Sequence, residues 1–327
     1  MVDKIVVTTF APVVIPTLCR YQHFRNCLET LAQCTWAEYT EVYVGLDYPL
    51  NESHCEGYDK IKNYLEHFSV KNRFKKLHVI MHKTNQGVTK NLKAICDVVS
   101  ARYDRWIFSE DDNIFSPNFL VFINKGLEKF KDDPTVISIN GYRHFYDIQT
   151  CGNSFFRQNV DFSAWGYGIW KDRYEAYKDI DRKYFRRHAY SLKSMAKMWR
   201  NGYMRLAGMY SCAGKHWNGS KSDNVLSVYM ALEDMDVIMP VVSCVRNCGV
   251  DGSGVHFVDV DRNFYELHQN QVIDDKDTFH FIGTGLEYYI ENKRAFRTQS
   301  YGRISIFQLF RIMVKFYLSE LLGGRNG

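Results

Sequence analysis

Short apolar runs alternate with longer segments of helical periodicity over the first 140 residues of this chain. Apolar residues that recur every three or four positions, such as Phe24, Leu28 and Leu31, indicate an amphipathic helix, whereas unbroken apolar runs indicate buried strands. The predicted strands cover residues 13–15, 41–46, 76–81, 105–109 and 136–139, and the predicted helices cover residues 18–33, 58–68, 88–99 and 119–130. Because a strand–helix–strand unit joins parallel strands, this alternation predicts an α/β fold, in which helices flank both faces of a mostly parallel sheet.

The second half of the chain has a less regular pattern. Residues 159–170 are aromatic and rich in glycine, residues 182–199 form a basic segment of helical periodicity, and residues 237–246 have the pattern of a late strand. We expect a further helix over residues 225–232 and a separate, strongly apolar helix near the C-terminus, over residues 304–322.

The composition excludes several classes of protein. A hydrophobic content of 46% over 327 residues supports a folded core, either as two domains or as one large domain with an appendage. The 42 Lys and Arg residues exceed the 37 Asp and Glu residues by only five charges, so we expect no nucleic-acid partner. Nine cysteines without a CxxC pair, no signal-peptide pattern and no apolar run of about 18 residues together predict a cytoplasmic protein.

Three consecutive acids directly follow one of the predicted strands. Glu110, Asp111 and Asp112 come after the apolar run that ends near Phe108, and ligands of parallel sheets bind at the carboxyl ends of the strands. Adjacent carboxylates repel each other unless a cation lies between them, and Mg²⁺ or Mn²⁺ typically joins such carboxylates to substrate phosphates. A solvated acidic turn is the alternative interpretation.

Six segments resemble, in the same order, the nucleotide-sugar-dependent glycosyltransferases of the GT-A fold. The resemblance covers residues 10–257 and concerns bacterial family 2-like enzymes and the Golgi N-acetylglucosaminyltransferase family. The segments are Ile15-Pro-Thr-Leu-Cys-Arg20, Val44-Gly-Leu-Asp47, Asn85-Gln-Gly87, Glu110-Asp111-Asp112, Ala164-Trp-Gly-Tyr-Gly-Ile-Trp170 and residues 240–256. The resemblance implies a GT-A (Rossmann-like) fold with a C-terminal helical appendage.

The resemblance also implies which residues bind the donor. In such enzymes the last acid of the triplet binds a divalent metal, Mn²⁺ or Mg²⁺, which assigns that role to Asp112, and a late histidine, here His256, completes the metal shell. The nucleotide-sugar ligands that it implies are Thr17, Arg20, Asp47, Asn85, Gly87, Lys90, Glu110, Asp111, Trp165 and Gly166. Structural alternatives stay open, because Arg20, Lys90 and His256 are also typical surface residues, Asp47 can start a turn and Trp165 can belong to the core.

An inverting transfer needs a base that takes the proton of the acceptor hydroxyl. By resemblance to the Golgi enzymes, Asp223 is the expected catalytic base, because it precedes a helix upstream of the late strand. The alternative is that Asp223 only caps this helix. Glu233 and Asp234 lie at the far end of the same helix and are weaker candidates.

The resemblance implies a metal-dependent, inverting hexosyl- or N-acetylhexosaminyltransferase. It would move a sugar from a UDP-sugar to a carbohydrate or lipid-linked acceptor in surface polysaccharide synthesis. Residues 1–265 would form the catalytic domain, with a nucleotide-sugar half over 1–150 and an acceptor half over 151–265, and residues 266–327 a C-terminal extension.

Two other classes stay open. A nucleotidyltransferase of sugar phosphates shares the metal acids, but it normally has a Gly-rich signature near the first strand, and residues 11–20 contain no glycine. A non-catalytic carbohydrate-binding protein would use the aromatic residues, yet it would have no use for an acid triplet beside a diphosphate.

The C-terminal helix is apolar around most of its circumference. Only a narrow stripe is polar, and it consists of Gln308, Arg311, Lys315 and Ser319. Such a helix has to bury most of its surface. We expect it either to dock on its own domain or a second subunit as a homodimer contact, or to lie in a membrane interface, which would make the protein peripheral on the inner face of the cell membrane.

Overall fold

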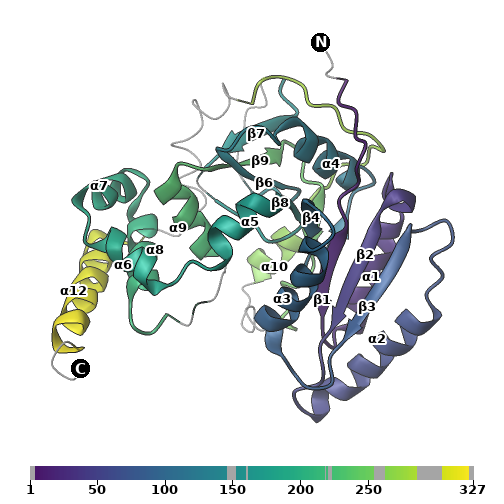
Figure 1. The fold of residues 1–327 in the computed structure, drawn as a ribbon, viewed down its shortest axis with the longest axis horizontal. Helices are drawn as coiled ribbons and strands as arrows, with labels where there is room; N and C mark the ends of the chain where they lie inside the picture. The colour runs from purple at the N-terminus through teal and green to yellow at the C-terminus, as the bar shows by residue number, and fades with distance from the viewer. Residues whose placement is uncertain are drawn as a thin grey trace.

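The computed structural model of this protein describes residues 4–145, 152–159, 161–217, 219, 223–253, 262–285 and 304–323. Its centre is an eight-stranded sheet with the order β3-β2-β1-β4-β8-β6-β9-β7 (Figure 1). These strands are β1 (Val13–Thr17), β2 (Glu41–Leu46), β3 (Lys76–Met81), β4 (Arg105–Phe108), β6 (Val136–Asn140), β7 (Phe155–Gln158), β8 (Tyr167–Trp170) and β9 (Asp236–Pro240). A second, two-stranded sheet consists of β5 (Asn113–Phe115) and β10 (Val245–Asn247).

Helices cover both faces of the sheet or lie beside it. They are α1 (Tyr21–Ala32), α2 (Cys55–His67), α3 (Gly87–Ser100), α4 (Phe119–Lys129), α5 (Lys171–Lys178), α6 (Arg182–Ala189), α7 (Leu192–Arg200), α8 (Tyr203–Ala213), α9 (Asp223–Glu233), α10 (Arg262–Gln269) and α12 (Ile306–Gly323). Two short 3₁₀ turns, η1 (Ala37–Tyr39) and η2 (Glu52–His54), complete the described elements.

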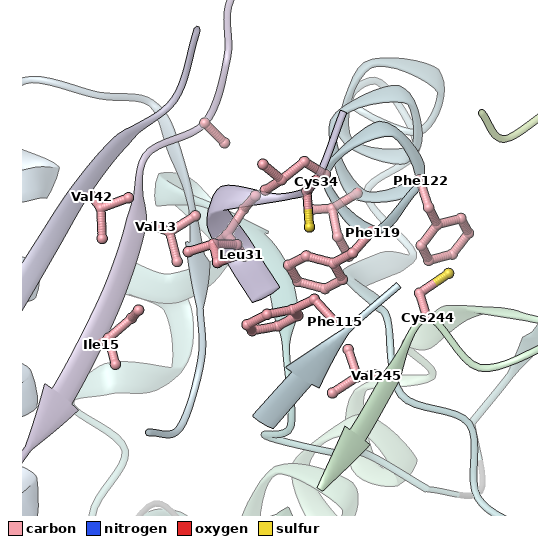
Figure 2. Close-up of a cluster of buried hydrophobic side chains, with 14 of the residues drawn as sticks. Val13, Ile15, Leu31, Cys34, Val42, Phe115, Phe119, Phe122, Cys244 and Val245 are labelled. Atoms are coloured by element: carbon pink, nitrogen blue, oxygen red, sulfur yellow. The ribbon is translucent and has the colours of Figure 1, made fainter. Parts of the chain in front are cut away.

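Strand β1 shows how the sequence pattern produces the layers. Val13 and Ile15 pack on one face against residues of α1, α2 and α4, whereas Val14 packs on the other face against α3. Successive side chains of a strand point to opposite faces, so a run of apolar residues suits a strand that is covered on both sides. Figure 2 shows the first of these two clusters, in which Val13 lies beside Leu31 of α1, and Phe119 of α4 lies beside Phe115.

The predicted α/β fold is confirmed. Strands β3, β2, β1 and β4 are mutually parallel, as the predicted alternation of strands and helices requires, and β6 and β9 are parallel to each other. The sheet is mixed in its second half, because β8 is antiparallel to β4 and β6, and β7 is antiparallel to β9. Strand β7 ends just before the Gly-rich segment of residues 159–170, and β8 lies within that segment. The sequence pattern predicted neither strand.

The prediction of a single strand over residues 237–246 is wrong. The main-sheet strand β9 ends at Pro240, and the chain then turns away and pairs through β10 with β5 instead. Proline has no N–H to extend a ladder of hydrogen bonds, which favours the end of a strand at this position.

Residues 182–199 are helical, as their periodicity predicts, and the structure divides them into two helices. Helix α6 ends before Tyr190, and α7 starts after Ser191, whose side chain accepts a hydrogen bond from the Ser194 N–H at 3.3 Å. A serine cap of this kind satisfies an N–H group at a new helix start. Helices α6, α7, α8, α9 and α12 form a helical lobe at one side of the sheet, with α12 along its outer edge (Figure 1).

No helix within the described residues is long and apolar enough to cross a bilayer.

Candidate active site

The acid triplet lies at the carboxyl end of β4, next to the end of its parallel neighbour β1. Asp111 and Asp112 are buried, and the Thr17 hydroxyl donates a hydrogen bond to Asp111 Oδ2 at 2.7 Å. The Arg20 guanidinium forms ion pairs with both acids, at 2.7 Å in the case of Asp112. Helix α1 begins only at Tyr21, three residues later than predicted, which leaves Arg20 in the loop that faces the acids.

The small sheet of β5 and β10 holds Asp112 in place. Asn247, the last residue of β10, donates from Nδ2 to Asp112 Oδ1 at 2.5 Å, and the Cys248 N–H donates to the Asp112 carbonyl at 2.9 Å. A Cβ atom at Gly249 would overlap Asp112 Oδ2, so this close approach of backbone and carboxylate requires glycine. The late segment therefore contacts the acid directly.

The site concentrates more negative charge than its single guanidinium neutralises. Burial raises the pKa of Glu110 well above its usual range, and the charges of Asp112 and Asp223 raise it further. Burial likewise raises the pKa of Asp112, although Arg20 opposes the shift. Burial opposes the charged form of Arg20, but Asp111 and Asp112 raise its pKa and keep it charged. These carboxylates therefore favour an additional cation.

Asp223 reaches the acid triplet from the helical lobe. It is the first residue of α9, and its carboxylate accepts a hydrogen bond from the Ala164 N–H at 3.1 Å. Burial raises the pKa of Asp223 to about 7, and the charge of Asp161 contributes. Asp223 as a residue is half-buried.

The loop before β8 lies between Asp223 and the core. Gly166 adopts a left-handed φ of 78°, which allows the turn into the strand. Trp165 is half-buried and contacts Tyr142 edge to face, with ring centroids 4.6 Å apart, and it also contacts His268 at 5.9 Å. One part of the indole thus belongs to an aromatic cluster, and another part stays exposed.

The residues expected around the nucleotide gather at the end of β2. Asp47 is buried, and its carboxylate accepts hydrogen bonds from the Gln86 and Gly87 N–H groups, both at 2.8 Å. These bonds hold the first turn of α3, in which Gly87 has a φ of 73°. Asn85 donates to the Tyr48 carbonyl at 2.6 Å, and Lys90 is exposed on the first turns of α3.

The donor chemistry of the site fits a hard divalent ion. Glu110 and Asp112 offer carboxylate oxygens, and Mg²⁺ commonly takes only one or two carboxylates and completes its shell with phosphates and water. Among the described residues, no group of three or more His, Cys, Asp or Glu side chains lies close enough together to hold a metal ion by itself. His256, the second expected metal ligand, lies outside the described residues.

Two contacts at the site involve residues that sequence reasoning did not assign to it. Asn247 belongs to the segment that carried the resemblance, but only the pairing of β10 with β5 brings its amide to Asp112. Asp161 forms an ion pair with His144 at 3.2 Å and acts on Asp223 through its charge. No sequence signal identifies this pair, because 17 positions separate Asp161 from His144 and 62 positions separate it from Asp223.

The fold and the site define an α/β protein whose acidic site lies at the carboxyl ends of mostly parallel strands. No protein-family model and no curated protein matches the sequence.

Several solved structures resemble parts of the chain. Residues 1–349 of TarS from S. aureus are 15% identical, with 51% of this chain and 49% of that chain covered and a TM-score of 0.35. The mannosyltransferase PcManGT from Pyrobaculum calidifontis, in complex with GDP-Man and Mn²⁺, is 11% identical over 70% of this chain and 75% of its own, with a TM-score of 0.39. Mouse xyloside xylosyltransferase 1, in its apo form, is 12% identical over 72% and 85%, with a TM-score of 0.34.

This chain thus spans about half the length of the TarS fragment that it matches. Likenesses of this size do not assign the chain to a family.

Proposed function

We propose that this protein is a glycosyltransferase that moves a sugar from a nucleotide-sugar donor to a hydroxyl group of a carbohydrate or lipid-linked acceptor. One observation carries the proposal: buried acids pair with Arg20 at the carboxyl end of β4, and Asp223, more than 110 positions later in the chain, has a charge that raises the pKa of Glu110. Arg20 pairs with Asp111 and Asp112 and leaves the triplet able to bind a further cation, whereas Asp223 has a pKa of about 7.

Asp223 is the proposed general base. A base is most effective when its pKa lies near the working pH, and a pKa of about 7 meets this condition. The hydrogen bond from Ala164 orients one carboxylate oxygen, which leaves the other to accept the proton of the acceptor hydroxyl. The deprotonated oxygen would attack the anomeric carbon opposite the diphosphate, so a single displacement with one base inverts the configuration.

The leaving diphosphate would lie at the acid triplet. A divalent ion such as Mn²⁺ or Mg²⁺, bound through Asp112 and Glu110, would neutralise charge on the departing phosphates. Arg20 and Lys90 are the proposed cationic contacts of the phosphates, and Thr17 and Asn247 hold the acids in position by the hydrogen bonds described above. His256 is proposed as a further metal ligand.

The remaining donor contacts follow the same arrangement. We assign the nucleotide base to Asp47, Asn85 and Gly87 at the end of β2, and the transferred sugar to the exposed part of Trp165 and to Gly166. A UDP-sugar is the proposed donor, and a hexose or an N-acetylhexosamine is the proposed transferred group.

Thermal unfolding with a panel of UDP- and GDP-sugars, with and without Mn²⁺, tests the proposal. We expect one donor to raise the melting temperature only when Mn²⁺ is present, and the same donor to be slowly hydrolysed to its nucleoside diphosphate. Stabilisation by nucleoside triphosphates with release of pyrophosphate would instead identify a nucleotidyltransferase. Stabilisation by oligosaccharides alone, without any donor hydrolysis, would identify a carbohydrate-binding protein.

A further inference from the structure

Helix α12 has two apolar faces, and only one of them packs against the described protein. Leu309 and Phe316 are buried in the helical lobe. The opposite face carries an outer stripe of exposed apolar side chains, with Phe307 82% and Phe310 66% exposed. The outer stripe consists of Phe307, Phe310, Val314, Leu318 and Leu321. Its members follow each other at three or four positions, so they form one continuous surface.

Contacts of the buried face hold α12 firmly on the lobe. The rings of Phe316 and Tyr210 of α8 are 5.2 Å apart, and the Tyr317 hydroxyl donates to the Ala189 carbonyl at 3.0 Å. Glu320 forms ion pairs with Arg182 and Arg186 of α6, the latter at 2.5 Å. These contacts fix the orientation of the helix, and the outer stripe therefore faces away from α8.

Three helices of the lobe, including α12 itself, are strongly basic. Helices α6, α7 and α12 together contain nine Lys and Arg residues and one acid, Glu320, which amounts to a net charge of +8. The whole chain has a net charge of only +5, so all other residues together have a net charge of −3. Arg311 and Lys315 lie beside the outer stripe on α12 itself, and both are exposed.

We propose that the outer stripe binds the surface of an anionic lipid bilayer, with α12 parallel to the membrane plane. Exposed aromatic and aliphatic side chains would enter the boundary between headgroups and acyl chains. Arg311 and Lys315 would reach the lipid phosphates, since long cationic side chains extend from apolar surfaces toward polar headgroups. The basic helices α6 and α7 add attraction to the anionic surface.

The same charge disfavours a second copy of this chain as the occupant. A symmetric contact through α12 would bring the exposed Arg311 and Lys315 of one copy close to those of the other, and like charges oppose such an interface. An anionic surface, in contrast, compensates this charge while it covers the apolar side chains. The inference does not depend on the proposed glycosyl transfer.

Co-sedimentation of the full chain with lipid vesicles tests the proposal. We expect binding to vesicles that contain phosphatidylglycerol, at least tenfold weaker binding to vesicles of phosphatidylcholine alone, and a decrease of binding as salt is added. A full chain that ignores phosphatidylglycerol vesicles at low salt would overturn the proposal.

Paired variants separate the stripe from general surface effects. Phe307→Gln with Phe310→Gln should reduce vesicle binding at least tenfold, whereas the control pair Val6→Gln with Val272→Gln, at positions 71% and 79% exposed, should leave it unchanged. Both double variants should keep the melting temperature, because all four side chains are exposed. Arg311→Gln with Lys315→Gln should weaken the binding and flatten its salt dependence.

Measuring the oligomeric state tests the alternative that the outer stripe is a contact between two copies of the chain. If the wild-type chain is a dimer in light scattering and Phe307→Gln with Phe310→Gln makes it a monomer without any change in vesicle binding, the stripe is an interface between copies and the proposal is wrong. Equal vesicle binding by the wild-type chain and the stripe variant would also overturn it.

Discussion

At the scale of single residues, the site depends on how the environment changes otherwise ordinary carboxylates. Asp223 and Asp112 have the same side chain, yet Asp112 is buried against Arg20 and Asn247, whereas Asp223 is half-buried and bound by one backbone N–H. These differences suit Asp112 for binding charge and Asp223 for moving a proton.

Replacement of the proposed base should separate turnover from donor binding. In Asp223→Asn we expect kcat to fall about 10²- to 10⁴-fold while donor affinity stays within about twofold, because a base acts on the acceptor. Glu233→Gln, at the other end of α9, is the matched control and should keep kcat. Near-normal turnover of Asp223→Asn would remove Asp223 from this role.

Replacement of Asp112 should instead reduce donor binding. Asp112→Asn should abolish the Mn²⁺-dependent part of donor binding and leave the fold intact, because the amide keeps the size of the side chain and loses its charge. Calorimetric titration of donor with and without Mn²⁺ measures this effect. Asp104→Asn, at the opposite end of β4, is the control, and an unchanged Mn²⁺ dependence of Asp112→Asn would refute the assignment.

At the scale of elements, two short strands and one helix end decide the geometry of the site. The pairing of β5 with β10 places Asn247 and Gly249 against Asp112, and the start of α9 places Asp223 beside Ala164. Neither contact belongs to the regular alternation of strands and helices.

Gly249→Ala tests whether the close approach of the β10 loop matters. The added Cβ would overlap Asp112 Oδ2, so the carboxylate has to move, and we expect metal-dependent donor affinity to fall at least tenfold. Gly214→Ala is the control, since its φ of −70° is ordinary and no atom lies closer than 3.3 Å to the added Cβ. Equal donor affinities of both variants would show that the loop tolerates the displacement.

The docking of α12 should depend on Glu320. The side chain of this acid is only 8% exposed and is bound to two arginines, so Glu320→Gln should lower the free energy of unfolding by about 1–2 kcal/mol, because two partly exposed guanidinium groups lose their partner. Glu56→Gln, which breaks the exposed pair with Lys60, should cost clearly less, because solvent screens an exposed ion pair. Thermal or urea unfolding distinguishes the two, and equal losses would contradict the docked arrangement.

At the scale of the whole molecule, the sheet joins a basic helical lobe to an acidic site. The buried acids of this site lower the stability of the fold, and this loss of stability depends on pH. The folded state holds a proton on Asp223 up to a pH of about 7, far above the ordinary pKa of an aspartate in an unfolded chain. Between about pH 4 and pH 7 the folded state binds more protons, so this group lowers stability as the pH rises.

Asp223→Asn should therefore stabilise the protein at pH 8. We expect the free energy of unfolding to exceed that of the wild type by about 1–2 kcal/mol. This is less than the full pKa shift would give, because Asp223 is half-buried and solvent screens part of the effect. The gain should vanish near pH 4. Unfolding in urea at both pH values measures the difference. A gain of equal size at pH 4 would mean that packing, and not ionisation, changed.

Much of the fold and part of the site followed from local patterns. Strands β1 to β4 and helices α1 to α4 were predictable because the spacing of apolar residues within each segment indicates whether it is a strand or a helix. The acid triplet was equally visible, because its three members are adjacent and follow an apolar strand. The break between α6 and α7 and the strands β7, β8 and β10 were not predicted, since their patterns are short and depend on which neighbours cover them.

The sequence by itself determined the alternating α/β architecture, the position of the acids at a strand end and the double apolar character of the last helix. Only the tertiary structure decided which groups surround the acids, because Arg20, Asn247 and Asp223 reach them from 91 to 135 positions away and electrostatic interactions depend on distance in space. It also decided which face of α12 is buried, because burial requires a partner surface, and α8 covers Leu309 and Phe316 while the outer stripe faces outward.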